Sequence, residues 1–379
     1  MTTLSSAQKE IPPDMIDLGI GQPSPWLLPV EAIARAAEHC RDRPECMLLS
    51  YGSEQGDGHF RTVLSGFLEK IYAMPVDPTR LLVTNGASQG LDLVCTLFSQ
   101  AGDCILVEEP TYFLARKIFA DHHLQPVALP MDSEGLIIEA VEEELKRSRP
   151  AFLYTIPAYH NPTSVCLSAT RREQLAELSR RHTLLVVADE VYHPLSYTSS
   201  PPPPLARSCD LAPVISLGSF SKILAPGLRL GWLQAGPAVI ERIVTCGLLD
   251  SGGGLNPYTS GVVRSAMELG LTEANLSALK KTYARRMQAM CSALRSRLPG
   301  SVRFTEPDGG FFIWLTLSDE ADTLALLPKA RKRNVEFMPG PRFSNRHALN
   351  NCLRLSFAYY DTPELLQGID RLAPVLAGR

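Results

Sequence analysis

Polar residues follow four short apolar runs of this 379-residue chain, at the points where predicted strands end. They are NGASQG (85–90) after LLVT (81–84), AYHNPTS (158–164) after AFLYT (151–155), Asp189 at the end of LLVVAD (184–189), and SFSK (219–222) after VISL (214–217). About one strand-plus-helix crossover separates Asn161 from Asp189, and another separates Asp189 from Lys222. Because ligands gather at the carboxyl ends of parallel strands, we expect these three side chains to meet in one crevice.

A lysine, an aspartate and an asparagine around one ligand suit pyridoxal phosphate. The Lys222 amine would form a Schiff base with the cofactor aldehyde, and the Asp189 carboxylate would keep the pyridine nitrogen protonated, so that the ring accepts electrons. The NGASQG segment would donate backbone N–H groups to the phosphate as it opens a helix over 89–100. Ser219 and Arg229 would complete the phosphate site, and Tyr112 would stack on the ring.

The elements that position these residues alternate between short β-rich runs and helical patterns from about 81 to 235. Two further runs, CILV (104–107) and LGWLQA (230–235), belong to this series. Such alternation predicts an α/β fold with a doubly wound, mainly parallel sheet between helices. From about 280 the pattern predicts a second, smaller α+β domain with a long amphipathic helix, strands at 302–304 and 311–315, another helix, and a strand–helix pair ending near Leu376.

One segment, S-F-S-K-I-L-A-P-G-L-R-L-G-W (219–232), resembles the S-x-S-K-x-x-x-P-G-x-R-x-G segment of the class I/II aminotransferases, which are fold-type I pyridoxal-phosphate enzymes. Other matching motifs occur in the family's order. They are L-G-I-G-Q-P (18–23), Y-G-S-E-Q-G (51–56), T-N-G-A-S-Q-G (84–90), E-P-T-Y (109–112), H-N-P-T (160–163), D-E-V-Y (189–192), P-D-G-G-F-F (307–312), P-G-P-R-F (339–343) and L-R-L-S-F (353–357). The resemblance covers about residues 15–375. Within the family, the sequence is most similar to the branch that handles 2-aminoadipate, kynurenine or branched-chain amino acids.

The resemblance implies a fold-type I transferase with a mainly parallel seven-stranded sheet in a large cofactor domain, 51–279. A small α+β domain, 280–379, would follow it, and the segment 1–50 would associate with the small domain or wrap the large one. The resemblance also implies a homodimer of amino-acid metabolism whose active sites are shared between subunits, and the lack of a signal-peptide or membrane-spanning pattern predicts a cytoplasmic location. Its partners would be amino acids and 2-oxo acids, with no nucleic acid, membrane or metal.

Each matching position carries an implied role. The cofactor phosphate would be held by Gly86, Ala87, Ser88, Ser219 and Arg229, and Tyr51 would reach the phosphate in the partner subunit. Asn161 and Tyr192 would hydrogen-bond the phenolic oxygen of the cofactor, Tyr112 would stack on its ring, and Asp189 would pair with the ring nitrogen. Arg354 would bind the substrate α-carboxylate with Asn161 beside it, and Gly21 would lie near the substrate. Lys222, Asp189 and Tyr112 form the expected catalytic group.

Two segments depart from the family pattern. Ser164 stands where the family usually has glycine, which affects the expected local turn but not the Asn161 contact. The segment LLDSGGGLNPYTSG (248–261) is rich in glycine, and we expect its Asn256 and Tyr258 to approach the partner's site.

The predicted reaction is a two-stage amino transfer in which the freed Lys222 amine moves the substrate Cα proton. Elimination, decarboxylation or cyclisation on the same cofactor stays open. The run from Ser219 to Lys222 also fits the S-x-x-K motif of serine acyl enzymes, but the supporting S-D-N and K-T-G elements are missing. A ligand-sensing regulator would need a DNA-binding domain, for which we expect no room. The motifs do not define the substrate side chain, and no second arginine can be placed in the pocket.

The composition of the chain limits the kinds of molecule that it is expected to bind. The chain has 37 basic and 40 acidic residues and no long Lys/Arg run, so the sequence favours no nucleic-acid surface. No apolar run approaches the roughly 18 residues that span a bilayer, and the N-terminus lacks a signal-peptide pattern.

The nine cysteines show no C-x-x-C spacing, and the histidines show no H-E-x-x-H, which leaves a metal centre without support. The proline run within 199–206 predicts a surface loop.

Overall fold

The computed structural model describes residues 11–43, 48–197 and 201–378, and its central element is a sheet with the strand order β2-β9-β8-β7-β6-β3-β4-β5. The strands are β2 (Leu81–Thr84), β3 (Cys104–Glu109), β4 (Gln125–Asp132), β5 (Gly135–Leu136), β6 (Leu153–Thr155), β7 (Val186–Asp189), β8 (Val214–Ser219) and β9 (Gly231–Ala235). Only the pairings of β9 and β5 are antiparallel. The predicted mainly parallel sheet is confirmed, with the two-residue β5 added as an eighth strand.

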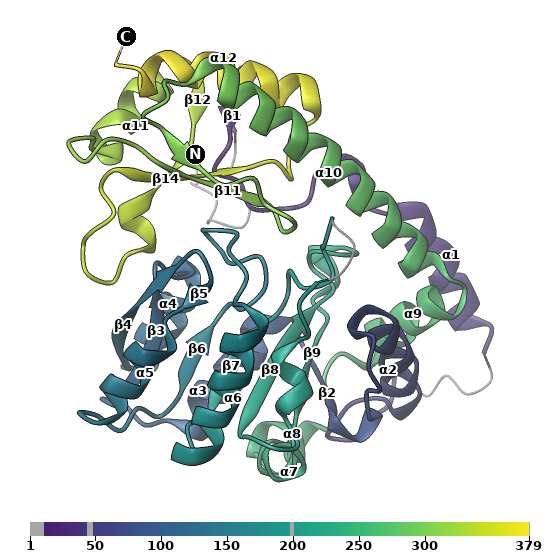
Figure 1. Ribbon diagram of the computed structural model, residues 1–379. Coiled ribbons are helices and arrows are strands. Elements are labelled where there is room, and N and C mark those ends of the chain that lie inside the picture. The colour runs from purple at the N-terminus through teal and green to yellow at the C-terminus, as the bar shows by residue number, and fades with distance from the viewer. Residues whose placement is uncertain (1–10, 44–47, 198–200, 379) are drawn as a thin grey trace.

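Helices cover both faces of this sheet, as the alternating strand residues require. In β7, Val186 and Ala188 pack on one face against α5 and α6, whereas Val187 packs on the other face with α3, α4, α7 and α8. Figure 1 shows α5 and α6 in front of the sheet. The helices are α3 (Ala87–Phe98), α4 (Phe113–Asp121), α5 (Ile138–Leu145), α6 (Ala169–His182), α7 (Pro237–Val244) and α8 (Gly247–Gly252).

A second group of elements lies together beyond one end of the large sheet (Figure 1). Its antiparallel sheet has the order β10-β11-β14-β13, and β1 pairs in parallel with β12. These strands are β1 (Ile16–Asp17), β10 (Arg303–Phe304), β11 (Phe312–Thr316), β12 (Val335–Glu336), β13 (Met338–Pro339) and β14 (Cys352–Ser356), and the helices are α10 (Leu271–Arg297), α11 (Thr323–Arg331) and α12 (Thr362–Leu376). The β1–β12 pairing ties the N-terminal segment to the C-terminal part of the chain.

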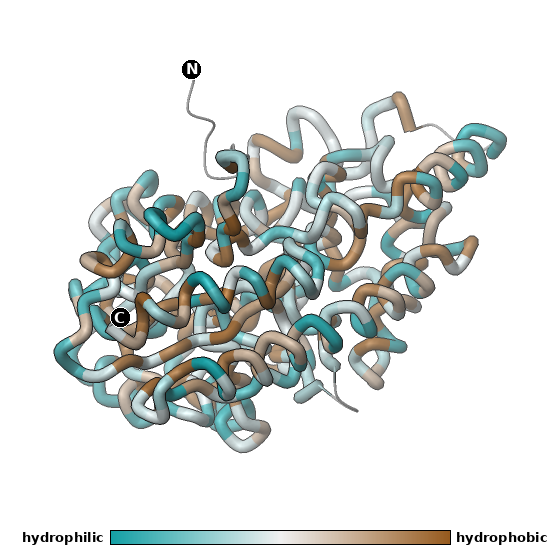
Figure 2. Tube along the Cα trace, turned by 90° about the horizontal axis from the view of Figure 1, so that it is seen from above, coloured by the Kyte–Doolittle hydropathy of each residue, from teal (hydrophilic) through white to brown (hydrophobic). Residues whose placement is uncertain are grey.

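Three further helices lie beside the large sheet: α1 (Val30–Arg41), α2 (Gly58–Tyr72) and α9 (Pro257–Glu268). Helix α1 packs on α9 through buried Ala36, Cys40, Val262 and Ala266. In Figure 2 the tube alternates between teal and brown along the helices, as expected where each helix has one buried and one exposed face. No helix in the described parts of the chain is both long and apolar enough to cross a membrane.

Several boundaries differ from the sequence prediction. The helix expected over 89–100 spans Ala87–Phe98, and the long helix expected from 280 begins at Leu271. Strand β4 was missed because Pro126 and Pro130 interrupt its apolar pattern, although prolines are tolerated in a strand near the edge of a sheet. Of the proline run, positions 199 and 200 lie outside the described residues, and the rest joins β7 to β8.

Candidate active site

A cavity of about 920 Å³ lies at the carboxyl ends of the parallel strands and also touches the smaller sheet. Nearly all the predicted site residues line it, and they come from segments far apart in the sequence. They are Gly21, Ala87, Ser88, Tyr112, Asn161, Asp189, Tyr192, Ser219, Lys222, Arg229 and Arg354. Two predicted residues, Gly86 and Tyr51, do not line the cavity. The roles assigned to these residues stay predictions, whereas their convergence is a property of the structure.

Lys222 is half-buried in the turn that follows β8. Its Nζ donates to the carbonyl oxygen of Gly21 at 3.1 Å and lies 5.9 Å from the ring centre of Tyr192 and 5.8 Å from that of Phe311. Burial, together with the positive charge of Arg354, lowers the pKa of this amine to about 8. A lysine of this kind loses its proton far more readily than an exposed one, as a nucleophilic amine requires.

Asp189 closes β7, and its carboxylate accepts a hydrogen bond that the sequence did not reveal. The hydroxyl of Tyr154, on the neighbouring strand β6, donates to Oδ2 at 2.8 Å. Burial raises the pKa of Asp189, while the bond from Tyr154 acts in the opposite direction. Tyr154 was missed because a tyrosine inside an apolar strand has the pattern of an ordinary core residue.

The start of helix α3 offers backbone donors to an anion. Gly86 is the N-cap residue with φ of 86°, a left-handed value that favours glycine. A Cβ at this position would lie 3.0 Å from Nη2 of Arg229, so glycine also leaves room for that guanidinium. Ala87 and Ser88, the first helical residues, line the cavity beside it. A helix N-terminus with a nearby arginine suits a phosphate.

Arg229 is held in place by its neighbours. Its Nη2 donates to the carbonyl oxygen of Asn85 at 3.2 Å, and its own carbonyl oxygen accepts from Nδ2 of Asn256 at 2.6 Å. Ser219 donates its hydroxyl to that of Ser221 at 3.0 Å on the same wall. In this chain, therefore, Asn256 supports the arginine of its own subunit, and its expected approach to the partner's site is untested.

Arg354 lies buried in the middle of β14 and reaches into the cavity. Nη1 donates to Oδ1 of Asn161 at 2.7 Å, and Nη2 donates to the carbonyl oxygen of Gly19 at 2.7 Å. Its guanidinium carbon sits 4.0 Å above the ring centre of Phe312. Burial lowers the pKa of Arg354 to about 10, which leaves the side chain charged at neutral pH. Two predicted substrate-binding residues, Arg354 and Asn161, are therefore directly hydrogen-bonded to each other.

Tyr112 and Tyr192 border the same space. Tyr112 is the N-cap residue of α4, and burial raises the pKa of its hydroxyl to about 12. Tyr192 packs edge-on against Phe311 and Phe312, at 5.4 and 5.7 Å between ring centres. Burial also raises the pKa of Tyr192, so both hydroxyls keep their protons at neutral pH and can act as hydrogen-bond donors.

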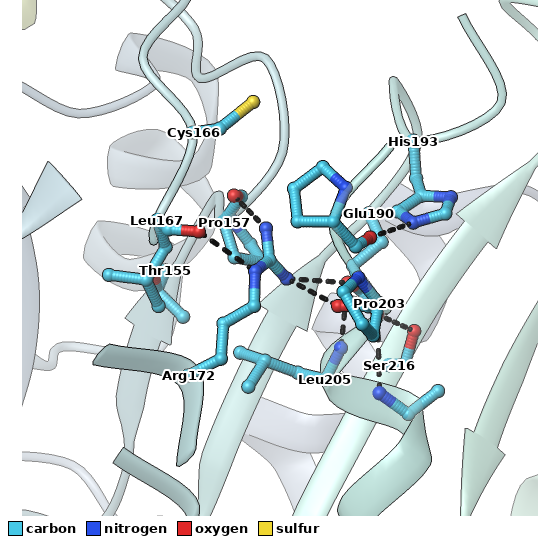
Figure 3. A network of polar contacts seen from close by, with 12 residues as sticks. Thr155, Pro157, Cys166, Leu167, Arg172, Glu190, His193, Pro203, Leu205 and Ser216 are labelled. Atoms are coloured by element: carbon cyan, nitrogen blue, oxygen red, sulfur yellow. Dashed lines mark hydrogen bonds and ion pairs between the residues drawn. The ribbon is translucent and has the colours of Figure 1, made fainter. Parts of the chain in front are cut away.

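The loop that carries Asn161 is anchored at both ends by one buried arginine, Arg172 of α6 (Figure 3). Nε of Arg172 donates to the carbonyl oxygen of Leu167 at 2.9 Å, and Nη2 donates to that of Pro157. Its Nη1 also lies 3.7 Å from Oε1 of Glu190, the residue after Asp189. Arg172 thus connects two segments that build the cavity.

Ser164, in the same loop, adopts the turn that glycine usually provides. Its φ is 61°, in the left-handed region, so the departure from the family pattern did not prevent the turn. The hydroxyl of Ser164 donates to the carbonyl oxygen of Phe312 at 2.7 Å, which a glycine cannot do.

Tyr51 lies away from its own cavity, with its side chain 90% exposed. The glycine-rich segment packs on the adjoining loop, because Gly254 donates its N–H to the carbonyl oxygen of Gly52 at 3.4 Å. A Cβ at Gly253 would lie 2.3 Å from that same oxygen. The glycines therefore permit a close backbone contact with the loop of Tyr51, while Tyr258 is 55% exposed.

The donor set of the cavity fits pyridoxal phosphate. A half-buried amine of lowered pKa, a buried carboxylate and the α3 N-terminus beside Arg229 line one space, and Nε of Arg354 is buried with no hydrogen-bond partner among the described residues. In those same residues no cluster of three or more His, Cys, Asp or Glu side chains could hold a metal ion.

The model of the family described as aminotransferase class I and II matches residues 13–372. The chain belongs to this family, and it is a pyridoxal-phosphate-dependent aminotransferase of fold type I.

Three relatives illustrate the branch. Aromatic-amino-acid aminotransferase 1 of Thermococcus litoralis is 32% identical over 96% of this chain and 88% of its own length. The crystal structure of the α-aminoadipate aminotransferase LysN of Thermus thermophilus, complexed with N-(5'-phosphopyridoxyl)-L-leucine, superposes with a TM-score of 0.87 at 32% identity, covering 99% of this chain and 95% of that chain. The kynurenine aminotransferase of Pyrococcus horikoshii superposes with a TM-score of 0.89 at 33% identity, covering 97% and 92%. The prediction of amino transfer is confirmed, and these relatives lend no support to elimination, decarboxylation or cyclisation.

Proposed function

We propose that this aminotransferase moves the amino group of an L-α-amino acid to a 2-oxo acid with Lys222, Asp189 and Arg354 as its principal residues. The observation that carries the proposal is their convergence: a half-buried amine of lowered pKa, a buried carboxylate and a buried guanidinium line the same cavity. Each of these groups is costly to bury alone, so their assembly in one place favours a functional site.

The residues that would hold the cofactor form groups according to the part of the cofactor that each would contact. Gly86, Ala87 and Ser88 would offer backbone donors to the phosphate, with Ser219 and Arg229 beside them. Tyr112 would stack on the ring, Asn161 and Tyr192 would donate to its phenolic oxygen, and Asp189 would face its nitrogen. When bound, the cofactor supplies an aldehyde for an amine and a ring that accepts the electron pair of the substrate Cα–H bond.

Lys222 would act as the proton carrier. Its amine would accept the proton from the substrate Cα when neutral and return that proton later in the cycle. The pKa of about 8 suits both directions, because the two protonation states of the amine lie close in free energy near neutral pH. The Gly21 carbonyl, 3.1 Å from Nζ, would help to orient the amine toward the cavity.

Arg354 would bind the substrate α-carboxylate. Its planar guanidinium offers parallel N–H donors that match a carboxylate, and its contacts with Asn161, Gly19 and Phe312 hold the plane in one orientation. Gly21 would leave room beside it, since a Cβ there would lie 3.0 Å from the Phe312 ring.

We further propose a homodimer in the cytoplasm, with Tyr51 donating to the cofactor phosphate of the partner subunit. The 90% exposure of Tyr51 and its distance from its own cavity support this arrangement. The eight described cysteines form no disulfide bond with one another, as is usual in a reducing compartment. The division into segments 1–50, 51–279 and 280–379 and a role in biosynthetic amino-acid metabolism belong to the same proposal.

A panel of amino acids mixed with the purified holoenzyme tests the reaction. Without any 2-oxo acid, amino transfer should convert the cofactor to its amine form and release one equivalent of 2-oxo acid. Arg354→Ala should raise KM for the amino acid by about tenfold or more, the effect of losing a buried charged partner. Release of ammonia or carbon dioxide instead would contradict the proposal.

A further inference from the structure

Ser164 joins two parts of the cavity wall that come from different sheets. It lies in the loop between β6 and α6, and its hydroxyl donates at 2.7 Å to the carbonyl oxygen of Phe312, on strand β11 of the smaller sheet. Its φ of 61° is in the left-handed region, which glycine adopts at the least cost in free energy. The feature that serine adds at this position is therefore the hydroxyl and its bond to Phe312.

The carbonyl oxygen of Phe312 receives no N–H from the strands beside it in the described parts of the chain. Strand β10 pairs only with the last two residues of β11. On the other side, Phe312 lies opposite Ser356, whose N–H donates instead to the carbonyl oxygen of Leu18 at 2.6 Å. Ser164 thus supplies a donor that the smaller sheet does not, at the first residue of β11, which lines the cavity.

The ring of Phe312 is one of two aromatic surfaces that contact Arg354. The guanidinium carbon lies 4.0 Å from the ring centre of Phe312 and 5.0 Å from that of Phe343. The N–H of Thr111, which follows β3, donates to the carbonyl oxygen of Phe343 at 3.0 Å. Both rings therefore lie on segments whose backbone is held by a loop that follows a strand of the large sheet.

The loop of Ser164 reaches Arg354 by two routes. Asn161 accepts directly from Nη1 at 2.7 Å, whereas Ser164 reaches the guanidinium only through Phe312. An aromatic ring in contact with a guanidinium limits the tilt of its plane. A carboxylate needs that plane in one orientation to form two parallel hydrogen bonds. Fixing the plane before the ligand arrives lowers the ordering cost of binding.

We propose that Ser164 is a positioning residue for substrate binding, because its hydroxyl holds Phe312 against Arg354 and so fixes the guanidinium plane before an α-carboxylate arrives. This inference rests on the proposed function, in which Arg354 takes the α-carboxylate. A glycine at this position cannot form the bond. Since every amino acid carries an α-carboxylate, the contribution of Ser164 is the same for acidic, aromatic and aliphatic substrates.

The test compares Ser164→Gly with Ser164→Ala, which both remove the hydroxyl but differ in the cost of the left-handed turn. The matched control Ser179→Ala removes a hydroxyl that donates to the carbonyl oxygen of Leu184, also at 2.7 Å, and Ser179 does not line the cavity. For each holoenzyme, KM and kcat are measured for one acidic, one aromatic and one aliphatic amino acid. Calorimetry measures the binding of isocaproate, a carboxylate without an amino group.

Both Ser164 variants should raise KM for all three amino acids, and Kd for isocaproate, by about fivefold, the usual effect of one lost hydrogen bond. The value of kcat should change by less than about twofold, and Ser179→Ala should leave all these values in place. If Ser164→Ala does not fold, Ser164→Gly still gives the result, because glycine relieves the turn.

A double-mutant cycle tests whether Phe312 transmits the effect. Phe312→Leu removes the ring beside Arg354 and keeps an apolar side chain, so Ser164→Gly added to it should raise KM by less than about twofold. A further fivefold rise in that background would show that Ser164 acts by another route. The absorbance spectrum of the bound cofactor should be the same in Ser164→Gly and the unmodified enzyme. A changed spectrum would show that Ser164 acts through Asn161 and the cofactor, and would overturn the inference.

The remaining outcomes separate this inference from the proposed function. If Ser164→Ala raises KM and Ser164→Gly does not, the backbone turn rather than the hydroxyl matters, and the positioning role is wrong. If neither variant changes KM or the binding of isocaproate, the role is also wrong while amino transfer stands. If the unmodified holoenzyme converts no amino acid, the proposed function fails, and the binding of isocaproate still tests Ser164.

Discussion

Tyr154 shows how much one buried hydroxyl can affect the chemistry of its neighbour. It donates to Oδ2 of Asp189 at 2.8 Å and opposes the rise in the pKa of Asp189 that burial causes. In its proposed role the Asp189 carboxylate would have to stay ionised to face a protonated ring nitrogen. Tyr154 is therefore a positioning residue for Asp189, beyond its contribution to the core.

Tyr154→Phe should raise the pKa of Asp189 further, because the hydrogen bond that favours the ionised form is lost. As pH falls, the variant should then lose cofactor affinity at a higher pH than the unmodified enzyme. Cofactor dissociation constants measured by absorbance across pH 5 to 8 check this shift. Tyr283→Phe, at a buried tyrosine whose hydroxyl has no partner among the described residues, is the control. Identical pH profiles for both variants would contradict the role of Tyr154.

The amine of Lys222 supplies a second prediction at this scale. In the proposed role only its neutral form would react with the cofactor aldehyde, and its pKa of about 8 means that this form increases as pH rises through that value. The rate of cofactor uptake by the cofactor-free protein should therefore rise with pH around 8. Arg354→Met removes a positive charge that lowers this pKa, so the rise should move to higher pH. Stopped-flow absorbance measures the rate, and Arg331→Gln, which changes a cavity arginine already paired with Glu336, should leave the midpoint in place.

At the scale of elements, the sequence revealed the strand ends but not what supports them. Asn161, Asp189 and Lys222 follow apolar runs whose composition marks them as strands, so their convergence was predictable. Arg172 was not, because a charged residue in the polar helix pattern of α6 is usually solvent-exposed. Only the packing of α6 on the loop around Asn161 turns it inward.

Arg172→Met should destabilise the protein by about 3 kcal/mol or more, since it leaves Glu190 buried without its cation and several loop carbonyls without a donor. Arg180→Met on the same helix breaks only the exposed pair with Glu177 and should cost far less. Urea unfolding of both variants compares the losses. Equal losses would show that the Arg172 contacts do not hold this region together.

Other elements escaped prediction for local reasons. Pro126 and Pro130 hid β4, and the polar residues after Leu271 hid the first two turns of α10. The positions of Arg331 and Arg342 at the cavity could not be predicted either, because they depend on how α11 and the segment after β13 pack around it. Periodicity finds elements, whereas contacts between distant segments come from their packing.

At the scale of the whole molecule, we propose that the active site of one chain is incomplete until Tyr51 of a second chain joins it. Tyr51 is 90% exposed, and its loop packs on the glycine-rich segment rather than on its own cavity. The proposed homodimer would have twice the chain's mass of 41.6 kDa. Its assembly is required for activity if Tyr51 serves the partner's cofactor.

Complementation between two variants tests this arrangement. Lys222→Ala should be inactive, and Tyr51→Ala should hold its cofactor weakly. A mixed dimer of the two has one site in which Lys222 and the Tyr51 of the other chain are both intact, so refolding the variants together should restore activity above that of either alone. Sedimentation velocity measures whether the refolded protein is a dimer. Activity no greater than the average of the separate variants would contradict the shared site.

The most direct test of the account is to identify the residue that holds the cofactor. Borohydride treatment of the holoenzyme fixes the cofactor covalently to the amine that binds it, and peptide mass mapping then locates the added mass. The account predicts the modification on Lys222, and its complete absence from the peptides of Lys222→Ala. A modification on any other lysine of the unmodified enzyme would contradict it.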